Sequence, residues 1–274
     1  MNTRFVTALA NEVRKGLRFA WSERLQIFIE LPMFAAFILL LGPLLGQGTR
    51  VVTGTVDWSL DSELTSVMVV WFVPFIFFYM QVVKMFWRLL GEIQAGTIEQ
   101  VYLSPLPSWL VAAAGRVVAA FLETLVVAAG TYGIVAVFVP IRIDWDAAAL
   151  LPAVMLMLAA VGVSLIIAGA TLVWKRIQLV NDTVLLMVML FSASAVPLID
   201  VPAWWAAMSH VFPLTDGVGS LYKALLTDQE ITAPWGIGGL VPMLITTAAY
   251  LAAGVLAFMW GERTAKRRGA LGHY

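Results

Sequence analysis

The sequence predicts an all-α membrane protein with six transmembrane helices. Of its 274 residues, 61% are hydrophobic and only 12% are charged, and the mean hydropathy is +0.89. A soluble domain carries about 25% charged residues. The apolar residues fall into six runs, each close to the roughly 20 residues that cross a bilayer of about 30 Å. The gaps between the runs are too short for a soluble domain, so we expect residues 25–274 to form one transmembrane domain.

Residues 1–24 are predicted to form an amphipathic helix ahead of the first span. At 100° per residue, one face is basic and the other is apolar, the latter made of Val6, Leu9, Ala10, Val13, Leu17, Ala20 and Trp21. A helix of this kind either packs on a soluble core or lies in the membrane interface. Because the chain has no soluble core, we expect the interfacial location. The N-terminus also lacks the pattern of a cleavable signal peptide.

The spans are expected at residues 25–46, 64–83, 109–140, 147–174, 177–199 and 233–260. The second, fourth and sixth are uncharged. The first contains Glu30, which we expect near the inner interface, either solvated or facing the elbow, and the fifth has Asp182 near its start. The third contains Arg116 and Glu123.

The distribution of Lys and Arg predicts the orientation. With both termini in the cytoplasm, thirteen of the 17 basic residues lie in inside segments and three lie in outside loops. This count places Lys84 and Arg88 in the inside segment after the second span. An excess of Lys and Arg marks the cytoplasmic side. The composition is rich in Ala, Val, Trp and Arg, so we expect a multi-pass protein of the plasma (inner) membrane of a bacterium.

Residues 88–108, between the second and third spans, are predicted to form a rigid cytoplasmic elbow. Gly96 permits a turn. Thr97 can cap the following helix, with Gln100 at the capping-box spacing. Pro105 and Pro107 end that helix. We therefore expect a short helix over residues 98–103, preceded by a cytoplasmic extension of the second span.

Residues 200–232, between the fifth and sixth spans, are too polar to cross the membrane and too apolar for a free loop. We expect a re-entrant or interfacial hairpin of short helices at the outer face, with apolar side chains such as Trp204, Leu221 and Leu225 partly in the bilayer. The alternative is that its aromatic residues only join the interfacial belt.

The elbow resembles the cytoplasmic coupling element of type-2 ABC exporter permeases. That pattern is a carboxylate, then Gly-Thr-x-Glu, then Ser-Pro before the third span. Its positions here are Glu92, Gly96, Thr97, Glu99, Ser104 and Pro105. A looser resemblance to the family's external segment covers Pro202, Trp204, Pro213, Leu214 and Thr215.

This resemblance implies a non-catalytic permease subunit of an ATP-driven ABC exporter. ATP and magnesium would be held by two separate nucleotide-binding subunits that bind the elbow, with Glu92 and Glu99 facing their basic groups. A second permease chain, identical or related, would pair with this one in the lipid, and the external segment would cap the exit path. The sequence has no G-x-x-x-x-G-K-[ST] loop to bind nucleotide phosphates, and we expect no cofactor in this chain. The apolar spans favour a drug, lipid or lipopeptide as cargo.

The two charges of the third span have several possible roles. Arg116 and Glu123 share a helix face to within about 20° but lie about 10 Å apart along the axis, too far for an assured ion pair. Intramembrane ionisable residues are costly and usually face the interior. Glu123 could be a structural partner, a substrate contact or a proton relay. Arg116 is expected to snorkel toward the cytoplasm in preference to a functional role.

Other function classes have weaker support. The net charge of zero gives no reason to expect a nucleic-acid partner. The chain has no Cys and only two His, so we expect no metal site. The alternatives that stay open are an integral-membrane lipid-modifying enzyme and an ion-coupled secondary transporter, each using Glu123. Against them, no internal repeat or metal-spaced cluster is evident.

Overall fold

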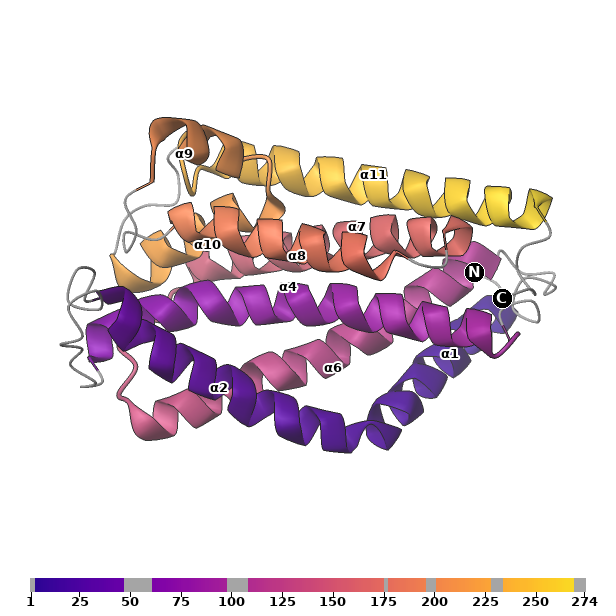
Figure 1. Ribbon diagram of the computed structural model, residues 1–274, viewed down its shortest axis with the longest axis horizontal. Helices are drawn as coiled ribbons and strands as arrows, with labels where there is room; N and C mark the ends of the chain where they lie inside the picture. The colour runs from indigo at the N-terminus through magenta and orange to yellow at the C-terminus, as the bar shows by residue number, and fades with distance from the viewer. Residues whose placement is uncertain are drawn as a thin grey trace.

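The computed structural model describes residues 3–46, 61–97, 108–174, 177–195, 201–227 and 234–268, and these residues form a bundle of helices (Figure 1). The helices are α1 (Thr3–Ser22), α2 (Arg24–Gly46), α4 (Ser62–Gln94), α6 (Ser108–Phe138), α7 (Leu150–Val173), α8 (Gln178–Ser192), α9 (Ala203–Ser209), α10 (Pro213–Leu226) and α11 (Leu240–Arg267). Short 3-10 turns flank α7 at Ala147–Ala149 and α8 at Ala193–Ala195. Within the described part of the chain, six helices are long and apolar enough to cross a membrane, namely α2, α4, α6, α7, α8 and α11. The all-α membrane fold is therefore confirmed.

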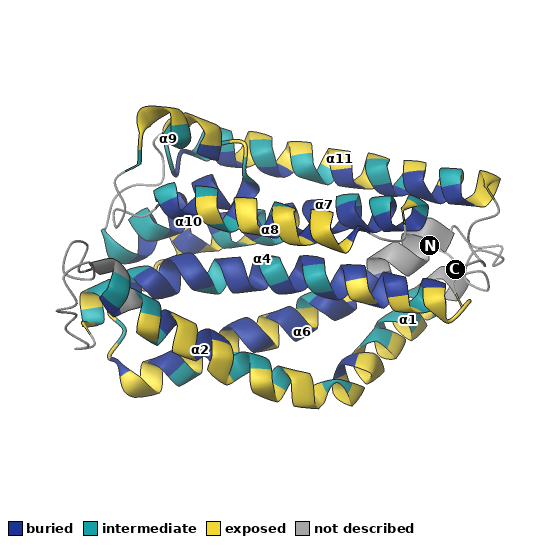
Figure 2. Cartoon of the chain, viewed as in Figure 1, coloured by how far each residue is buried: buried dark blue, intermediate teal, exposed yellow. Residues whose placement is uncertain are grey.

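α4 is the central helix of the bundle. It packs against α2, α6, α7, α8 and α10, and it is buried along most of its length, whereas α2 and α11 carry long exposed stripes (Figure 2). A helix that is hydrophobic on every face belongs in such a position. Phe72 of α4 stacks on Phe37 of α2 with ring centroids 4.5 Å apart. Trp71 Nε1 donates a 3.0 Å hydrogen bond to Ser192 Oγ of α8, so one buried polar contact also joins α4 to α8.

α4 continues past residue 83, the expected end of the second span, to Gln94, so the extension expected after that span is helical. Its last turns are rich in good helix formers, and Leu89 and Ile93 are buried there. Lys84 and Arg88 therefore lie inside the helix, and both are buried.

α7 and α11 approach one another through glycines. A Cβ at Gly169 would lie 2.4 Å from the carbonyl oxygen of Ala257, and one at Gly254 would lie 2.3 Å from that of Gly162. A Cβ at Gly261 would lie 2.2 Å from the carbonyl oxygen of Gly169. Small residues of this kind let membrane helices pack with their backbones in contact.

The two ends of the bundle differ. α1 begins, and α4 and α11 stop, at one end, which we call the proximal end; α9 and α10 lie at the opposite, distal end (Figure 1). α1 rests on α6 at the proximal end, where Gly16 packs on Ala119 and Gly115 packs on Glu12. The amphipathic helix is present, with Trp21 70% exposed, while its location in the membrane interface stays a prediction.

The described part of residues 200–232 contains two helices, α9 and α10. α10 packs into the bundle against α4, α7 and α11. Leu221 and Leu225, which we expected partly in the bilayer, are buried against protein instead, whereas Trp204 is 61% exposed. The re-entrant depth of the segment stays a prediction.

Candidate functional site

Two charged stripes face each other near the proximal end. Lys84, Arg88 and Glu92 occupy successive turns of α4, and Arg116 and Glu123 lie seven residues apart on α6. Residues four apart lie on the same face of a helix. The five side chains meet where α4 and α6 pack together.

Glu123 is held by two cations of α4. Lys84 Nζ lies 3.1 Å from Glu123 Oε1, and Arg88 pairs with Glu123 Oε2. The Glu123 side chain is only 1% exposed. Both carboxylate oxygens are thus engaged, and the geometry favours the structural role among the three that were open for this residue.

Two further carboxylates surround Lys84. Its ammonium lies 3.7 Å from Glu30 Oε1 and 3.8 Å from Glu23 Oε2, so three glutamates from different parts of the chain converge on one lysine. Glu30 has a side chain that is only 12% exposed, which contradicts the solvated one of its two expected settings. A buried charge of this kind persists only when it is paired.

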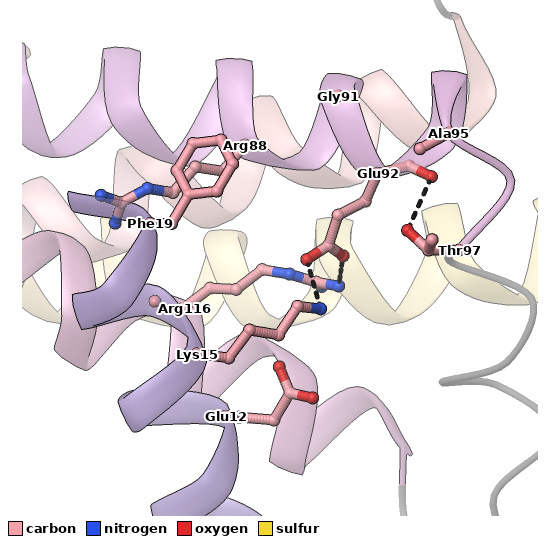
Figure 3. A pocket seen from close by; sticks show the side chains of 10 residues that line it. Glu12, Lys15, Phe19, Arg88, Gly91, Glu92, Ala95, Thr97 and Arg116 are labelled. Carbon is pink, nitrogen blue, oxygen red and sulfur yellow. Dashed lines mark hydrogen bonds and ion pairs between the residues drawn. The ribbon is translucent and has the colours of Figure 1, made fainter. Parts of the chain in front are cut away.

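Glu92 connects α1, α4 and α6. It accepts a 2.9 Å hydrogen bond from Lys15 Nζ of α1 and pairs with Arg116 of α6 (Figure 3). The Arg116 side chain is 5% exposed and reaches Glu92, so the expectation that it snorkels is wrong. Among the described contacts Arg116 makes no ion pair with Glu123, in keeping with their axial separation. Because Glu92 is already engaged within the chain, its contact with a partner subunit stays a prediction.

The start of the elbow has the expected turn. Gly96 adopts a φ of +67°, in the left-handed region that glycine tolerates. The Thr97 hydroxyl donates to the Glu92 carbonyl oxygen at 3.3 Å. Glu99, Ser104 and Pro105 lie outside the described residues, as does the expected helix over 98–103, and their role in docking stays a prediction.

A cavity of about 390 Å³ opens between α1, α4 and the start of α6 (Figure 3). It is lined by Glu12, Lys15, Gly16, Phe19, Arg88, Gly91, Glu92, Ala95, Thr97 and Arg116. Figure 3 shows Lys15 and Arg116 converging on the Glu92 carboxylate, while the Arg88 guanidinium lies beside the Phe19 ring.

The distal motif residues occupy α9 and α10. Pro202 precedes α9, Pro213 begins α10, and the next two residues, Leu214 and Thr215, are fully buried. Trp204 faces outward. Their role as an external gate stays a prediction.

Asp216 holds the distal segment together. Its Oδ1 lies 2.8 Å from His210 Nδ1 and 3.4 Å from the backbone N–H of Gly238, which donates to it. Gly236 and Gly238 have φ values of +92° and +72°, which permit the tight turn before α11. Burial raises the pKa of the Asp216 carboxyl above its ordinary value, against the opposing effect of His210.

A second cavity, of about 370 Å³, lies between α2, α4 and α8. Most of its lining is aromatic or aliphatic, and its one acidic residue is Asp182. The aromatic members are Phe34, Phe37, Phe72, Phe75 and Tyr79. Such a lining suits an apolar or amphipathic molecule.

Sequence reasoning missed Lys84 and Arg88 as partners of Glu123. The signal was present: residues 84, 88 and 92 are spaced four apart, and a helix extended past residue 83 places them on one face. Lys15 lies 77 residues from Glu92, and no local pattern indicates that pair.

Comparison with known families gives one match. A family model described as ABC-2 type transporter matches residues 36–226, from within α2 to the end of α10. A search of curated protein sequences returns no significant match. In the described part of the chain, no group of three or more His, Asp or Glu side chains is placed to hold a metal ion.

Proposed function

The chain belongs to the ABC-2 type transporter family, and we propose that it forms the pathway of an ATP-driven exporter for hydrophobic or amphipathic molecules. It is a multi-pass membrane protein and the permease subunit of an ABC transporter. The observation that carries the proposal is the family match, which spans most of the bundle in a chain whose sequence lacks a phosphate-binding loop.

We propose that two nucleotide-binding subunits hydrolyse ATP and bind the elbow that follows α4. Support comes from the continuity of α4, which runs unbroken from the elbow through the centre of the bundle to the distal end. A displacement at Gly96 would therefore reach α10, which packs directly on α4. A stiff helix suits this transmission because a flexible segment would absorb the movement.

We place a second permease chain against the face formed by α2 and α8. α2 exposes Phe28, Ile29 and Met33, which are 72%, 68% and 53% exposed, and α8 exposes Leu186 beside the aromatic cavity. A pathway at this seam would be apolar, with Asp182 at its edge. This lining favours a drug, lipid or lipopeptide over a small ion, which would require more carboxylates.

The proposed orientation places both termini in the cytoplasm of a bacterium. Because Lys84 and Arg88 are buried in α4, we leave them out of the count of basic residues on each side of the membrane. Eleven basic residues then remain in the inside segments, against three in the outside loops. The proximal end is then cytoplasmic, and α9 and α10 face outward.

Inverted membrane vesicles containing the chain and its ATPase partner test the proposal. We expect ATP-dependent uptake of a fluorescent phospholipid or an amphipathic dye, because the cytoplasmic face of these vesicles is outside. Glu99→Arg should abolish this uptake by reversing a charge in the elbow, whereas Glu63→Arg, at the other end of α4, should leave it intact. Uptake that needs no ATP, or that survives Glu99→Arg, would contradict the coupling role of the elbow.

A further inference from the structure

The cavity between α2, α4 and α8 is lined by a series of aromatic rings in contact. Phe37 of α2 stacks on Phe72 of α4 with ring centroids 4.5 Å apart. The centroid of Phe72 lies 5.4 Å from that of Phe75, which in turn lies 6.0 Å from that of Tyr79. Phe34 of α2 completes the set, 6.5 Å from Phe72 and 6.3 Å from Tyr79. We call these five residues the aromatic ladder.

The aromatic ladder combines apolar contact with a preference for positive charge. Phe72, Phe75 and Tyr79 are spaced three and four apart, so they share one face of α4. The faces of aromatic rings carry partial negative charge. They attract a cation that lies within about 6 Å of the ring centroid, and aromatic cages recognise quaternary ammonium groups in this way. An anion of the same size gains no such attraction.

Asp182 adds a full negative charge to the same cavity. It is exposed near the start of α8 and is the one charged residue of the lining. It interacts electrostatically with Tyr79, which places it toward that end of the aromatic ladder. Glu30 also acts on Tyr79, but it is paired with Lys84 and does not line the cavity.

The charge of Asp182 is not neutralised within the described part of the chain. Its Oδ1 accepts a 3.1 Å hydrogen bond from Asn181 Nδ2, which is a neutral group. None of the ion pairs among the described residues involves Asp182. A positive charge on a ligand would therefore have a carboxylate to pair with.

The shape of the cavity favours a ligand with an apolar body. Its volume of about 370 Å³ lies within the range of small-molecule sites. Met33 and Leu186 also line it and are 53% and 48% exposed, so the cavity opens onto the apolar surface of α2 and α8. A small hydrated ion gains nothing from such a lining, whereas a lipophilic cation matches both the rings and the carboxylate.

We propose that this cavity binds a lipophilic cation, such as an amine or quaternary ammonium compound with aromatic or alkyl substituents. The positive charge lies between Asp182 and Tyr79, and the apolar body packs along Phe75, Phe72 and Phe37. The identification of this ligand as cargo rests on the proposed function. It narrows the drug, lipid or lipopeptide of that proposal to an amphiphile that carries positive charge.

Equilibrium dialysis of the purified full-length chain in nonionic micelles tests the proposal. The probes are tetraphenylphosphonium and tetraphenylborate, which have the same shape and opposite charge, and binding to protein-free micelles is subtracted. We expect tetraphenylphosphonium to bind more tightly by about fivefold or more, the value of one cation–π contact. Asp182→Asn should weaken tetraphenylphosphonium binding without weakening that of tetraphenylborate.

Matched variants separate the cavity from the rest of the surface. Tyr79→Leu keeps an apolar side chain but removes a ring of the aromatic ladder, and it should lower tetraphenylphosphonium binding. Phe28→Leu removes a ring that is 72% exposed on α2, outside the cavity, and should leave binding unchanged. Glu63→Gln removes an exposed carboxylate at the other end of α4 and should also leave it unchanged.

Two results would overturn the proposal. Equal binding of the two probes by the wild type would remove the selectivity for a cation, and unchanged selectivity in both Asp182→Asn and Tyr79→Leu would remove the cavity as the site. If Tyr79→Leu does not fold, Asp182→Asn decides alone, because its position is exposed.

The dialysis needs neither ATP nor a partner, so it fails independently of the proposed function. Equal binding of the probes, together with ATP-dependent uptake of a phospholipid in inverted vesicles, would retain the exporter and overturn the cation site. Selective binding of tetraphenylphosphonium without any ATP-dependent uptake would retain the cation site and overturn the exporter.

Discussion

Replacing Glu123 with Gln should destabilise the protein through the cations that it leaves behind. Lys84 would keep Glu30 and Glu23 at 3.7 and 3.8 Å, but Arg88 would lose its one ion-pair partner among the described residues. Removing one member of a buried ion pair costs about 3–5 kcal/mol. Because Lys84 retains partners, we expect a loss near the low end, about 3 kcal/mol, which is more than a hundredfold in the unfolding equilibrium.

The measurement is equilibrium unfolding in mixed detergent micelles, followed by the fluorescence of the chain's 11 Trp residues. Glu123→Gln/Arg88→Gln should recover most of the loss, because it leaves Lys84 with Glu30 and Glu23 and no uncompensated arginine. The control is Glu63→Gln, whose partner Arg142 is 3.8 Å away in an exposed pair, and which should cost less than about 1 kcal/mol. Wild-type stability in Glu123→Gln, together with lost transport, would refute the structural role and indicate a chemical one.

Three other predictions follow from the packing and the polar contacts. Gly169→Ala should force α11 away from α7 by about 1 Å, because the new Cβ would lie 2.4 Å from the Ala257 carbonyl oxygen. We expect it to lower the free energy of unfolding in micelles by about 2 kcal/mol. Gly133→Ala is the control and should not destabilise the protein, because a Cβ there meets nothing within 4 Å. Asp216 has a folded pKa raised above 3.8 by burial, so its contribution to stability is present below pH 3.8 and is lost as the pH rises through the folded pKa. Asp216→Asn should remove this loss of stability with rising pH. If the unfolding midpoint of Asp216→Asn depends on pH as that of the wild type does, the prediction is wrong. Trp71→Phe and Ser192→Ala should each cost about 1 kcal/mol, and the double variant should cost less than their sum, because both remove the same 3.0 Å hydrogen bond.

The number and type of the spans could be predicted because run length and hydropathy are local properties. Hydropathy alone does not give the end of α4. The apolar run stops before Lys84, whereas the helix continues through the expected extension because Leu89 and Ile93 are buried and the last turns favour helix. The turn at Gly96 was predictable, because the glycine supplies the left-handed backbone directly.

The ion pairs depend on tertiary structure to different degrees. The spacing of Lys84, Arg88 and Glu92 places them on one face once α4 is extended, so their shared position could be predicted. Their partners could not, because Lys15 and Arg116 come from α1 and α6 and reach Glu92 only after those helices pack. The sequence of α6 alone offers no partner close to Arg116, and we therefore expected its side chain to snorkel. Glu92 of the neighbouring helix α4 provides the counter-charge that keeps Arg116 buried.

The association of this chain with an ATPase is the central claim, and purification tests it most directly. The tagged chain is extracted from native membranes in mild detergent, and ATP hydrolysis is measured on the eluted material with Glu99→Arg in parallel. We expect a second polypeptide with a phosphate-binding loop and ATPase activity to elute with the wild-type chain, and to be reduced with Glu99→Arg. A chain that elutes intact and folded, with no second polypeptide and no ATPase activity, would contradict the proposed complex.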